Sequence, residues 1–419
     1  MGRTARDRRP PTPKPVERVQ MDERHFSRRM IAFLLCLAVA VAALGYGVYS
    51  WLNTEPGWVT IEARGGCGPE FTFRYLFTQG GMEDTDRHRT LRNLFDRLTI
   101  QAYRQFSPAE VLEEGTNLQY INAHPNQNVQ VEPVLYQAFE QAQAYEDRSV
   151  YLGPLYGLYT DLAYSQDDGE ARGYDPYESP EQAAFCQTVA DFARDPAAVN
   201  VKLLGDNTLR LEVSPAYLSY AQDQGVETFL DFGWQRNAYI IDYFAKELAS
   251  QGFTSGVLTS TDGFSRSLFA GAEPSLYSLY TWHEEGRAVV AGQVQLDQIG
   301  GAADFRAFPM PGQEGRCYVR EDGQIRHPYV DPEDGLCRAA VPALVLYAPD
   351  KTCVQLMEQG RRLFIAQNLD RTALAALTGE GIYALAVENG TLLHSDPAAE
   401  VQELYSGYEA QALPYSKRT

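Results

Sequence analysis

The chain has 419 residues, of which 44% are hydrophobic, and it carries a formal net charge of −19 at pH 7. This composition is too apolar for a disordered chain, and the length allows one large core or two ordinary ones. The acidic excess argues against nucleic acid as a partner, because binding to phosphates requires clusters of Lys and Arg.

The first 52 residues divide into a basic tail and an apolar span. Residues 1–29 contain nine Lys or Arg against four Asp or Glu, together with four prolines, which is typical of a disordered tail. Residues 30–52 are uncharged and mostly apolar. A helix of this length crosses a hydrocarbon core of about 30 Å, so the sequence predicts one transmembrane anchor.

The flanks of this span predict its orientation. Arg28 and Arg29 precede it, and Tyr46, Tyr49 and Trp51 lie at its other end. Basic residues stay on the cytoplasmic side, and aromatic residues favour the interface. We therefore expect a single-pass protein of the cell membrane with a cytoplasmic N-terminus and an extracytoplasmic, acidic bulk. A cleaved signal peptide is the competing interpretation, but the basic segment is long for one.

Beyond the span, the sequence predicts a linker segment over residues 53–68 that also holds a first strand, a single α+β domain over 69–410 and a tail over 411–419. The helices expected in chain order cover residues 89–106, 132–146, 179–192, 236–250 and 350–365. The strands expected in chain order cover residues 70–77, 209–213, 256–260, 341–348, 382–387 and 391–394. Asn389-Gly390 between the last two strands is the strongest hairpin signal.

The sequence contains no recognised motif for metal binding or for a catalytic nucleophile. The six cysteines form no C-x-x-C pair and no cluster with histidine, so zinc is not indicated. Cys317 and Cys337 bracket a predicted hairpin and form either a disulfide or two isolated buried thiols. The histidines show no H-E-x-x-H spacing, and no G-x-S-x-G elbow is present.

Two segments carry a family resemblance. Residues 229–242 read Phe-Leu-Asp-Phe-Gly-Trp-Gln-Arg-Asn-Ala-Tyr-Ile-Ile-Asp, and residues 327–335 read His-Pro-Tyr-Val-Asp-Pro-Glu-Asp-Gly. They resemble Leu-Asp-Leu-Gly-Gly-Ile-Ala-Lys-Gly-Tyr-Ala-Val-Asp and His-Ile-Ile-Asp-Pro-x-Thr-Gly, two signatures of the FAD:protein FMN transferases (ApbE-like flavin transferases). Three further segments, residues 118–135, 153–155 and 304–306, are similar to that family in the same order and spacing.

The resemblance implies a fold, a reaction and a set of site residues. The fold is a single ApbE-like α+β domain of mixed sheets flanked by helices, here preceded by the transmembrane helix. The family transfers FMN from FAD to a threonine of a partner protein, with Mg²⁺ as cofactor. Matching positions that the resemblance assigns to FAD binding are Asp231, Asn237, Tyr239, Asp304, Arg306 and Asp331.

Several positions that contact FAD or Mg²⁺ in the family carry different residues here. Trp234 replaces the second glycine of a loop that lies against FAD and holds the metal through a backbone carbonyl, and Asn237 replaces the lysine. A tryptophan crowds an approach that glycine permits. The family's Mg²⁺ ligands, an Asp and a Thr one helical turn apart, correspond to Gln355 and Gln359. Without a carboxylate the site attracts Mg²⁺ weakly.

Three more departures follow. The family's histidine falls on Pro328, and His327 is displaced by one position, which on a strand turns a side chain to the other face. His327 nevertheless is the one candidate for a catalytic residue. The hydroxyl pair before Asp304 becomes Gly301-Ala302, and the Phe-Asp pair before Gly153 becomes Arg148-Ser149.

These losses favour one functional hypothesis over two others. The favoured one is a membrane-anchored ApbE-like protein that has lost Mg²⁺-dependent catalysis and acts as a flavin-binding or scaffold module, with FAD a possible ligand and Mg²⁺ doubtful. The alternative is an active FAD:protein FMN transferase. A solute binder unrelated to flavin is the third. The expected partners are the membrane and an extracytoplasmic flavoprotein or redox-complex subunit.

Overall fold

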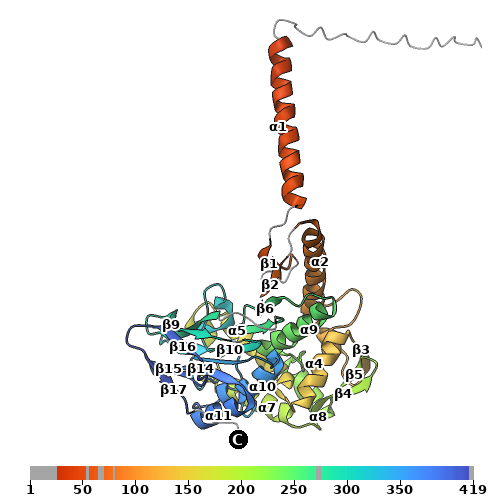
Figure 1. The fold of residues 1–419 in the computed structure, drawn as a ribbon. Helices are drawn as coiled ribbons and strands as arrows, with labels where there is room; N and C mark the ends of the chain where they lie inside the picture. The colour runs from red at the N-terminus through yellow and green to blue at the C-terminus, as the bar shows by residue number, and fades with distance from the viewer. Residues whose placement is uncertain are drawn as a thin grey trace, which may run out of the picture. The chain divides into compact units, whose positions relative to one another are not determined.

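The structure is a computed structural model that describes residues 26–52, 56–64, 70–78, 81–269, 275–297 and 299–414 (Figure 1). Side chains are not described for residues 26–29, 46–52, 81–82 and 314. The expected tail over residues 1–29 therefore lies mostly outside the described residues, as does Cys67.

The chain divides into two compact units, and the smaller one comprises residues 1–55 and 79–85. It contains helix α1 (Phe26–Leu52). The apolar side chains described on α1 are exposed, among them Phe33 at 62% and Leu44 at 69%. Over the residues that the structure describes, no helix is both long enough and apolar enough to cross a membrane.

The larger unit, residues 56–78 and 86–419, is built on a nine-stranded sheet. Its strands, in spatial order, are β1 (Gly57–Glu62), β2 (Phe71–Phe77), β6 (Gly256–Ser260), β7 (Phe264–Ser267), β10 (Gly301–Arg306), β13 (Ala343–Ala348), β14 (Tyr383–Glu388), β15 (Thr391–His394) and β17 (Glu409–Ala412). Neighbours pair antiparallel except β15 and β17, which are parallel. The sheet is therefore mixed, as predicted.

Both faces of this sheet are covered, and β13 shows why its sequence is apolar throughout. Leu344, Leu346 and Ala348 face the main core with the helices, whereas Val345 and Tyr347 face a second core. Successive side chains of a strand point to opposite faces, so a strand buried on both sides has no polar position. The second core is closed by a three-stranded sheet of β16 (Glu400–Leu404), β9 (Arg287–Leu296) and β8 (Ser275–His283).

The helices belong largely to the other face of the large sheet, where α9 and α10 pack against β6, β7, β10 and β13. The helices after α1 are α2 (Gly81–Gln105), α3 (Leu118–Ala123), α4 (Pro133–Ala144), α5 (Gly153–Ala163), α6 (Asp168–Ala171), α7 (Pro180–Arg194), α8 (Pro215–Gln224), α9 (Arg236–Ser250), α10 (Cys353–Phe364) and α11 (Arg371–Ala376). The remaining strands are β3 (Asn128–Gln130), β5 (Thr208–Val213) and β4 (Val199–Gly205) in one sheet, and β11 (Tyr318–Val319) with β12 (Ile325–Arg326) in a hairpin.

All the expected helices and strands of the larger unit are present, with shifts at their ends. The helix expected over residues 89–106 begins earlier, at Gly81. Residues 57–62, within the segment expected to hold a linker and a first strand, form β1, which pairs with residues 72–77 of β2. Residues 409–412, expected partly as a tail, form β17 at the sheet edge. Edge strands carry weak sequence signals, since one side has no partner.

Local signals are confirmed where a cap or a turn is involved. Ser179 caps α7, accepting a hydrogen bond from the backbone of Gln182. Asn389 and Gly390 both have positive φ, as a two-residue hairpin turn requires. Cys317 and Cys337 are buried free thiols, so among the described cysteines no disulfide is present and the isolated-thiol alternative holds.

Candidate functional site

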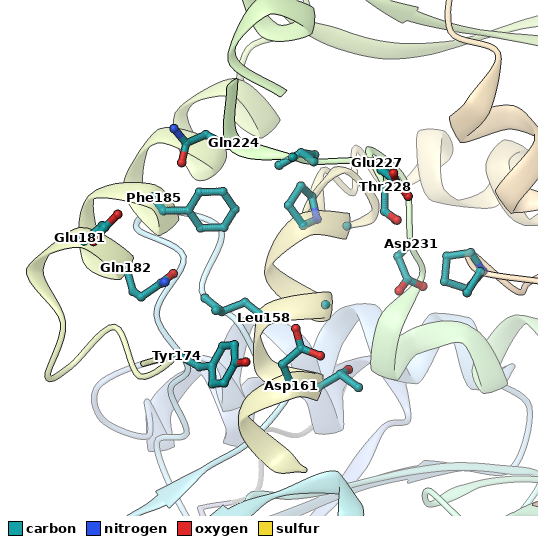
Figure 2. Close-up of a pocket in the computed structure, with 18 residues that line it drawn as sticks. Leu158, Asp161, Tyr174, Glu181, Gln182, Phe185, Gln224, Glu227, Thr228 and Asp231 are labelled. Atoms are coloured by element: carbon teal, nitrogen blue, oxygen red, sulfur yellow. The ribbon is translucent and has the colours of Figure 1, made fainter. Parts of the chain in front are cut away.

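A cleft of about 580 Å³ in the larger unit is the first candidate site. One wall is α5, which carries Leu158 and Asp161, and a second is the start of α7, which carries Glu181, Gln182 and Phe185 (Figure 2). The segment over residues 224–231 closes it. This volume is within the range of small-molecule sites.

Two of the segments that resemble the flavin transferases, residues 153–155 and 229–242, contribute to the lining of this cleft, and a third, residues 118–135, contacts the second of them. The Asn122 side chain accepts hydrogen bonds from the backbone of Phe229 and Leu230 at 3.1 and 2.9 Å, and it donates to the Leu230 carbonyl at 2.9 Å. A Cβ atom on Gly153 would lie 2.8 Å from the Thr228 carbonyl oxygen. Asparagine and glycine at these positions therefore let α3, α5 and the strand-like segment before α9 approach closely.

The lining of the cleft is acidic. Asp161, Glu181, Glu227 and Asp231 contribute carboxyl groups, and none of the 18 described lining residues is Lys, Arg or His. Carboxylates in a partly closed cleft repel anions and attract cations. A pyrophosphate group in this cleft would meet no positive side chain of the lining.

Asp231 is the one predicted site residue that lines the cleft. Its Oδ1 accepts a hydrogen bond of 2.8 Å from the Gly233 amide. Burial raises its pKa to about 6, against the lowering effects of the Gly233 and Phe232 backbone and of the Arg236 charge. Gly233 has φ +50, and a Cβ there would lie 2.9 Å from the Tyr156 ring, which explains the retained glycine.

Asn237 lies elsewhere, in a polar cluster around Asp262. Its amide nitrogen donates to Glu70 at 2.9 Å and to Asp262 at 2.8 Å. Arg236 bonds to Glu70 at 2.5 Å, and Arg316 lies 3.3 Å from Asp262. Both donors of the Asn237 amide are thus used within the protein.

Asp304 and Arg306 lie side by side on β10. The Arg306 Nε is 3.6 Å from Asp304 Oδ2, which also accepts 2.8 Å from the Tyr277 hydroxyl. The cavity beside Arg306, also lined by Asp262, Arg316 and Pro328, has a volume of about 20 Å³. This is far too small for a flavin, whose sites span about 300–1,000 Å³.

Trp234 fills space next to these residues. It is 5% exposed, and its ring lies 5.0 Å from that of Tyr329 and 5.7 Å from that of Phe305 between ring centroids. The indole Nε1 is buried without a hydrogen-bond partner. The side chain therefore closes this region by packing, in line with the crowding expected from the sequence.

His327, the candidate catalytic residue, is buried at 6% exposure, with its ring 5.5 Å from the Tyr329 ring. Its Nδ1 has no hydrogen-bond partner in the structure. Burial, with the nearby Arg326 charge second, lowers its pKa to about 3. His327 does not line the cleft, and its buried imidazole is neutral. We therefore assign it to the core.

The pKa of His327 predicts an acid-sensitive stability. The folded value of about 3 lies below the unfolded value of 6.5, so the stabilisation is complete above pH 6.5 and is lost as pH falls. Between pH 7 and pH 5, wild type should lose about 2 kcal/mol relative to His327→Gln. The measurement is urea unfolding of both proteins at both pH values. Other titrating groups act equally on both and cancel.

The matched control is His327→Asn, which places a second neutral side chain at the same position. It should show the same change relative to wild type between pH 7 and pH 5 as His327→Gln. An equal pH dependence of wild type and His327→Gln would show that His327 gains a proton in the folded protein, and the core assignment would fail.

Asp331 closes a turn. Its carboxylate accepts from the Glu333 amide at 2.9 Å and from Arg338 at 2.7 Å. The turn is also bonded through its backbone, from Gly335 N to Asp331 O at 2.8 Å. All these partners belong to the same loop, so the structure gives Asp331 a role in loop geometry.

The expected metal positions lie on α10. Thr352 and Gln355 form a capping box in which the Gln355 Oε1 accepts from the Thr352 amide at 2.9 Å. Gln355 and Gln359 are both half-buried, and the buried face of α10 instead carries Val354 and Glu358. A neutral amide oxygen that already accepts a hydrogen bond attracts Mg²⁺ more weakly than a carboxylate does. In the part of the chain that the structure describes, no group of three or more His, Cys, Asp or Glu could hold a metal ion.

Tyr239 belongs to a group that sequence reasoning missed, here called the core polar cluster. Its members are buried or nearly so and come from five segments: Asp147, Ser149, Tyr156, Gln235, Tyr239, Glu358 and Arg361. One feature of the sequence could have indicated this cluster: Glu358 and Arg361 lie on the otherwise apolar face of α10. Buried charges on a helix are almost always paired.

The architecture defines the class of this protein: an α+β fold with one large mixed sheet, helices on one face and a small sheet on the other. No family model matches the chain, and no curated protein does. Solved structures do match it. The flavin transferase ApbE from Vibrio cholerae aligns over 84% of this chain and 98% of its own, with a TM-score of 0.53 and 16% identity.

The ApbE protein from Thermotoga maritima aligns over 84% of this chain and 97% of its own, with a TM-score of 0.52 and 17% identity. The chain therefore has the fold of the ApbE flavin transferases, as the sequence resemblance implied. At this identity the likeness concerns the fold, and the site must be judged from its own residues.

Proposed function

We propose that this protein is a non-catalytic ApbE-fold module that binds a flavin or a partner protein and does not perform Mg²⁺-dependent FMN transfer. The observation that carries the proposal is α10, where the Gln355 oxygen is used in a capping box and the inward-facing pair is Val354 and Glu358. Phosphoryl transfer depends on cations that neutralise the developing charge, and the described lining of the cleft contains no Lys, Arg or His.

The cleft supports a preference among flavins. Its lining combines Phe185, Tyr174 and Leu158 with four carboxyl groups. An uncharged isoalloxazine ring fits the apolar part, whereas the pyrophosphate of FAD is repelled by the acids. Riboflavin should therefore bind at least about tenfold more tightly than FAD at low ionic strength, since about 1.4 kcal/mol of repulsion corresponds to tenfold.

Fluorescence titration of residues 56–419 or of the full chain with each flavin measures this preference. Added salt should narrow the difference, because exposed charges are screened. Glu227→Gln with Asp161→Asn removes two carboxylates of the lining and should improve FAD binding more than riboflavin binding. Tighter binding of FAD than of riboflavin in low salt would contradict the preference.

Transfer itself is tested by incubation with FAD, Mg²⁺ and a threonine-containing acceptor, followed by in-gel flavin fluorescence. We expect no covalently flavinylated product. An active FAD:protein FMN transferase is the second candidate, favoured by one observation: Asp231 lines the cleft with a pKa raised to about 6. A carboxyl in that range can accept a proton from a hydroxyl nucleophile. A fluorescent product lost in Asp231→Asn would establish this candidate.

We also propose that the chain is anchored in the cell membrane through residues 30–52, with the larger unit outside and an extracytoplasmic flavoprotein or redox-complex subunit as partner. The uncharged span, its Arg28-Arg29 flank and the exposed apolar side chains of α1 support this. Protease added to intact cells should degrade the larger unit and spare an epitope at the N-terminus. Protection of the larger unit with loss of the epitope would reverse the orientation.

A further inference from the structure

The core polar cluster gathers many of the buried polar atoms that lack a hydrogen-bond partner. Six buried atoms of its members have no hydrogen-bond partner: Asp147 Oδ2, Tyr156 OH, Gln235 Oε1, Tyr239 OH, Glu358 Oε1 and Arg361 Nε. Each such atom destabilises the folded state, because its hydrogen bond to water is lost and not replaced. Five of the six are oxygens, the ligand type that hard cations prefer.

The cluster is held together by one guanidinium. Arg361 Nη2 lies 2.7 Å from Glu358 Oε2, and Nη1 lies 3.3 Å from Asp147 Oδ1. Asp147 and Glu358 are each 3% exposed and come from segments more than 200 positions apart in the chain. Among the described residues, Arg361 is the only cation within 4 Å of these two carboxylates.

The hydroxyl and amide groups extend this arrangement. Ser149 Oγ donates to Asp147 Oδ1, and Gln235 Nε2 donates to Ser149 Oγ. The charges of Asp147 and Arg361 act on both Tyr156 and Tyr239, so the two phenols lie near the ion pairs. Arg361 thus pairs with two carboxylates, and a serine hydroxyl, a carboxamide and two phenols lie in the same buried cluster.

We infer that the guanidinium of Arg361 takes the place of a metal ion in this oxygen-rich site, and we call it the built-in cation. Because of it, the folded core needs no bound metal. The guanidinium supplies positive charge to two carboxylates that could not both be buried without it. If Arg361 is removed, the same cluster should bind a divalent cation, because its other members keep unpaired oxygens. The inference does not depend on whether flavin binds in the cleft.

The test removes the built-in cation and asks whether a metal replaces it. Arg361→Ala in the full chain should melt at a lower temperature than wild type in EDTA, and millimolar Ca²⁺ or Mg²⁺ should recover much of that loss. Wild type should melt at the same temperature with EDTA and with either metal. A ligand that binds only the folded state raises the melting temperature with its concentration, so the recovery should be dose-dependent.

Three variants sharpen the result. Arg362→Ala removes an exposed arginine from the next position and should show neither the loss nor the recovery. Glu358→Gln added to Arg361→Ala removes one carboxylate ligand and should abolish the recovery. Arg361→Gln keeps a long polar side chain, and it should acquire the same metal dependence if Arg361→Ala does not fold.

Two outcomes would overturn the inference. One is a metal-dependent rise in the melting temperature of wild type as large as that of Arg361→Ala, which would place a metal beside the arginine. The other is the absence of recovery by Ca²⁺, Mg²⁺ or Mn²⁺ in both Arg361 variants, which would leave the arginine as an ordinary ion-pair partner.

Discussion

Replacement of Asp175 by alanine is expected to lower the free energy of unfolding by about 3–5 kcal/mol. The side chain is fully buried, and both of its oxygens accept from Arg326 Nε at 3.0 Å. Arg320 Nη1 lies 3.3 Å from the same carboxylate. Removing the acid leaves the mostly buried guanidinium of Arg326 without its carboxylate partner, whereas Arg320 keeps other acidic partners. Chemical denaturation monitored by tryptophan fluorescence measures the change.

The control for this prediction is Asp322→Ala. Asp322 also faces Arg320, at 3.5 Å, but its side chain is 49% exposed. Ion pairs on the surface contribute about 0–1 kcal/mol, so the control should be near wild type. If Asp175→Ala were as stable as Asp322→Ala, the hairpin of β11 and β12 would not depend on this buried pair.

Replacement of Trp234 by alanine is expected to lower the free energy of unfolding by about 3–5 kcal/mol. The indole packs between Tyr329 and Phe305, and these rings in turn contact Phe364 of α10 at 4.9 and 5.3 Å between centroids. Truncation to alanine leaves a cavity, because the surrounding aromatic side chains are closely packed and cannot shift to fill it. Urea unfolding at pH 7 measures the loss.

Trp234→Phe distinguishes packing from hydrogen bonding. The indole Nε1 has no partner, so phenylalanine removes no hydrogen bond and keeps an aromatic ring in place. We expect it to lose less than half as much stability as Trp234→Ala. A near-neutral Trp234→Ala would mean that the region has room to accommodate a ligand, contrary to the packing described here.

Sequence reasoning reached the secondary structure of the larger unit because its signals are local. The helix over residues 236–250 and the strands over 256–260 and 391–394 agree with the structure at both ends. Periodicity, caps and turn residues act within a few positions of the chain. The resemblance to the ApbE flavin transferases likewise rested on short segments, and their fold is confirmed.

Local sequence signals could not predict which of the candidate site residues lie together in the structure. Five residues were expected around one ligand: Asp231, Asn237, Asp304, Asp331 and Tyr239. The structure places Asp231 in the cleft, Asp331 in a closed turn and Tyr239 in the core polar cluster. Asn237 bonds to Asp262, which lines the same small cavity as Arg306, the partner of Asp304. Hydrogen bonds between segments far apart in the chain decide these positions. A motif specifies residue types and leaves their partners open.

The sequence by itself determined the apolar strand β13, the helices around it and the absence of a carboxylate at positions 355 and 359. Only the tertiary structure decided which face of α10 turns inward. A Cβ on Gly360 would lie 2.3 Å from the Phe305 ring, so close packing on β10 sets the rotation of the helix. That rotation buries Glu358 and brings Arg361 to Asp147. Helical periodicity alone cannot specify it, because the position of the face depends on a partner strand about 55 residues earlier in the chain.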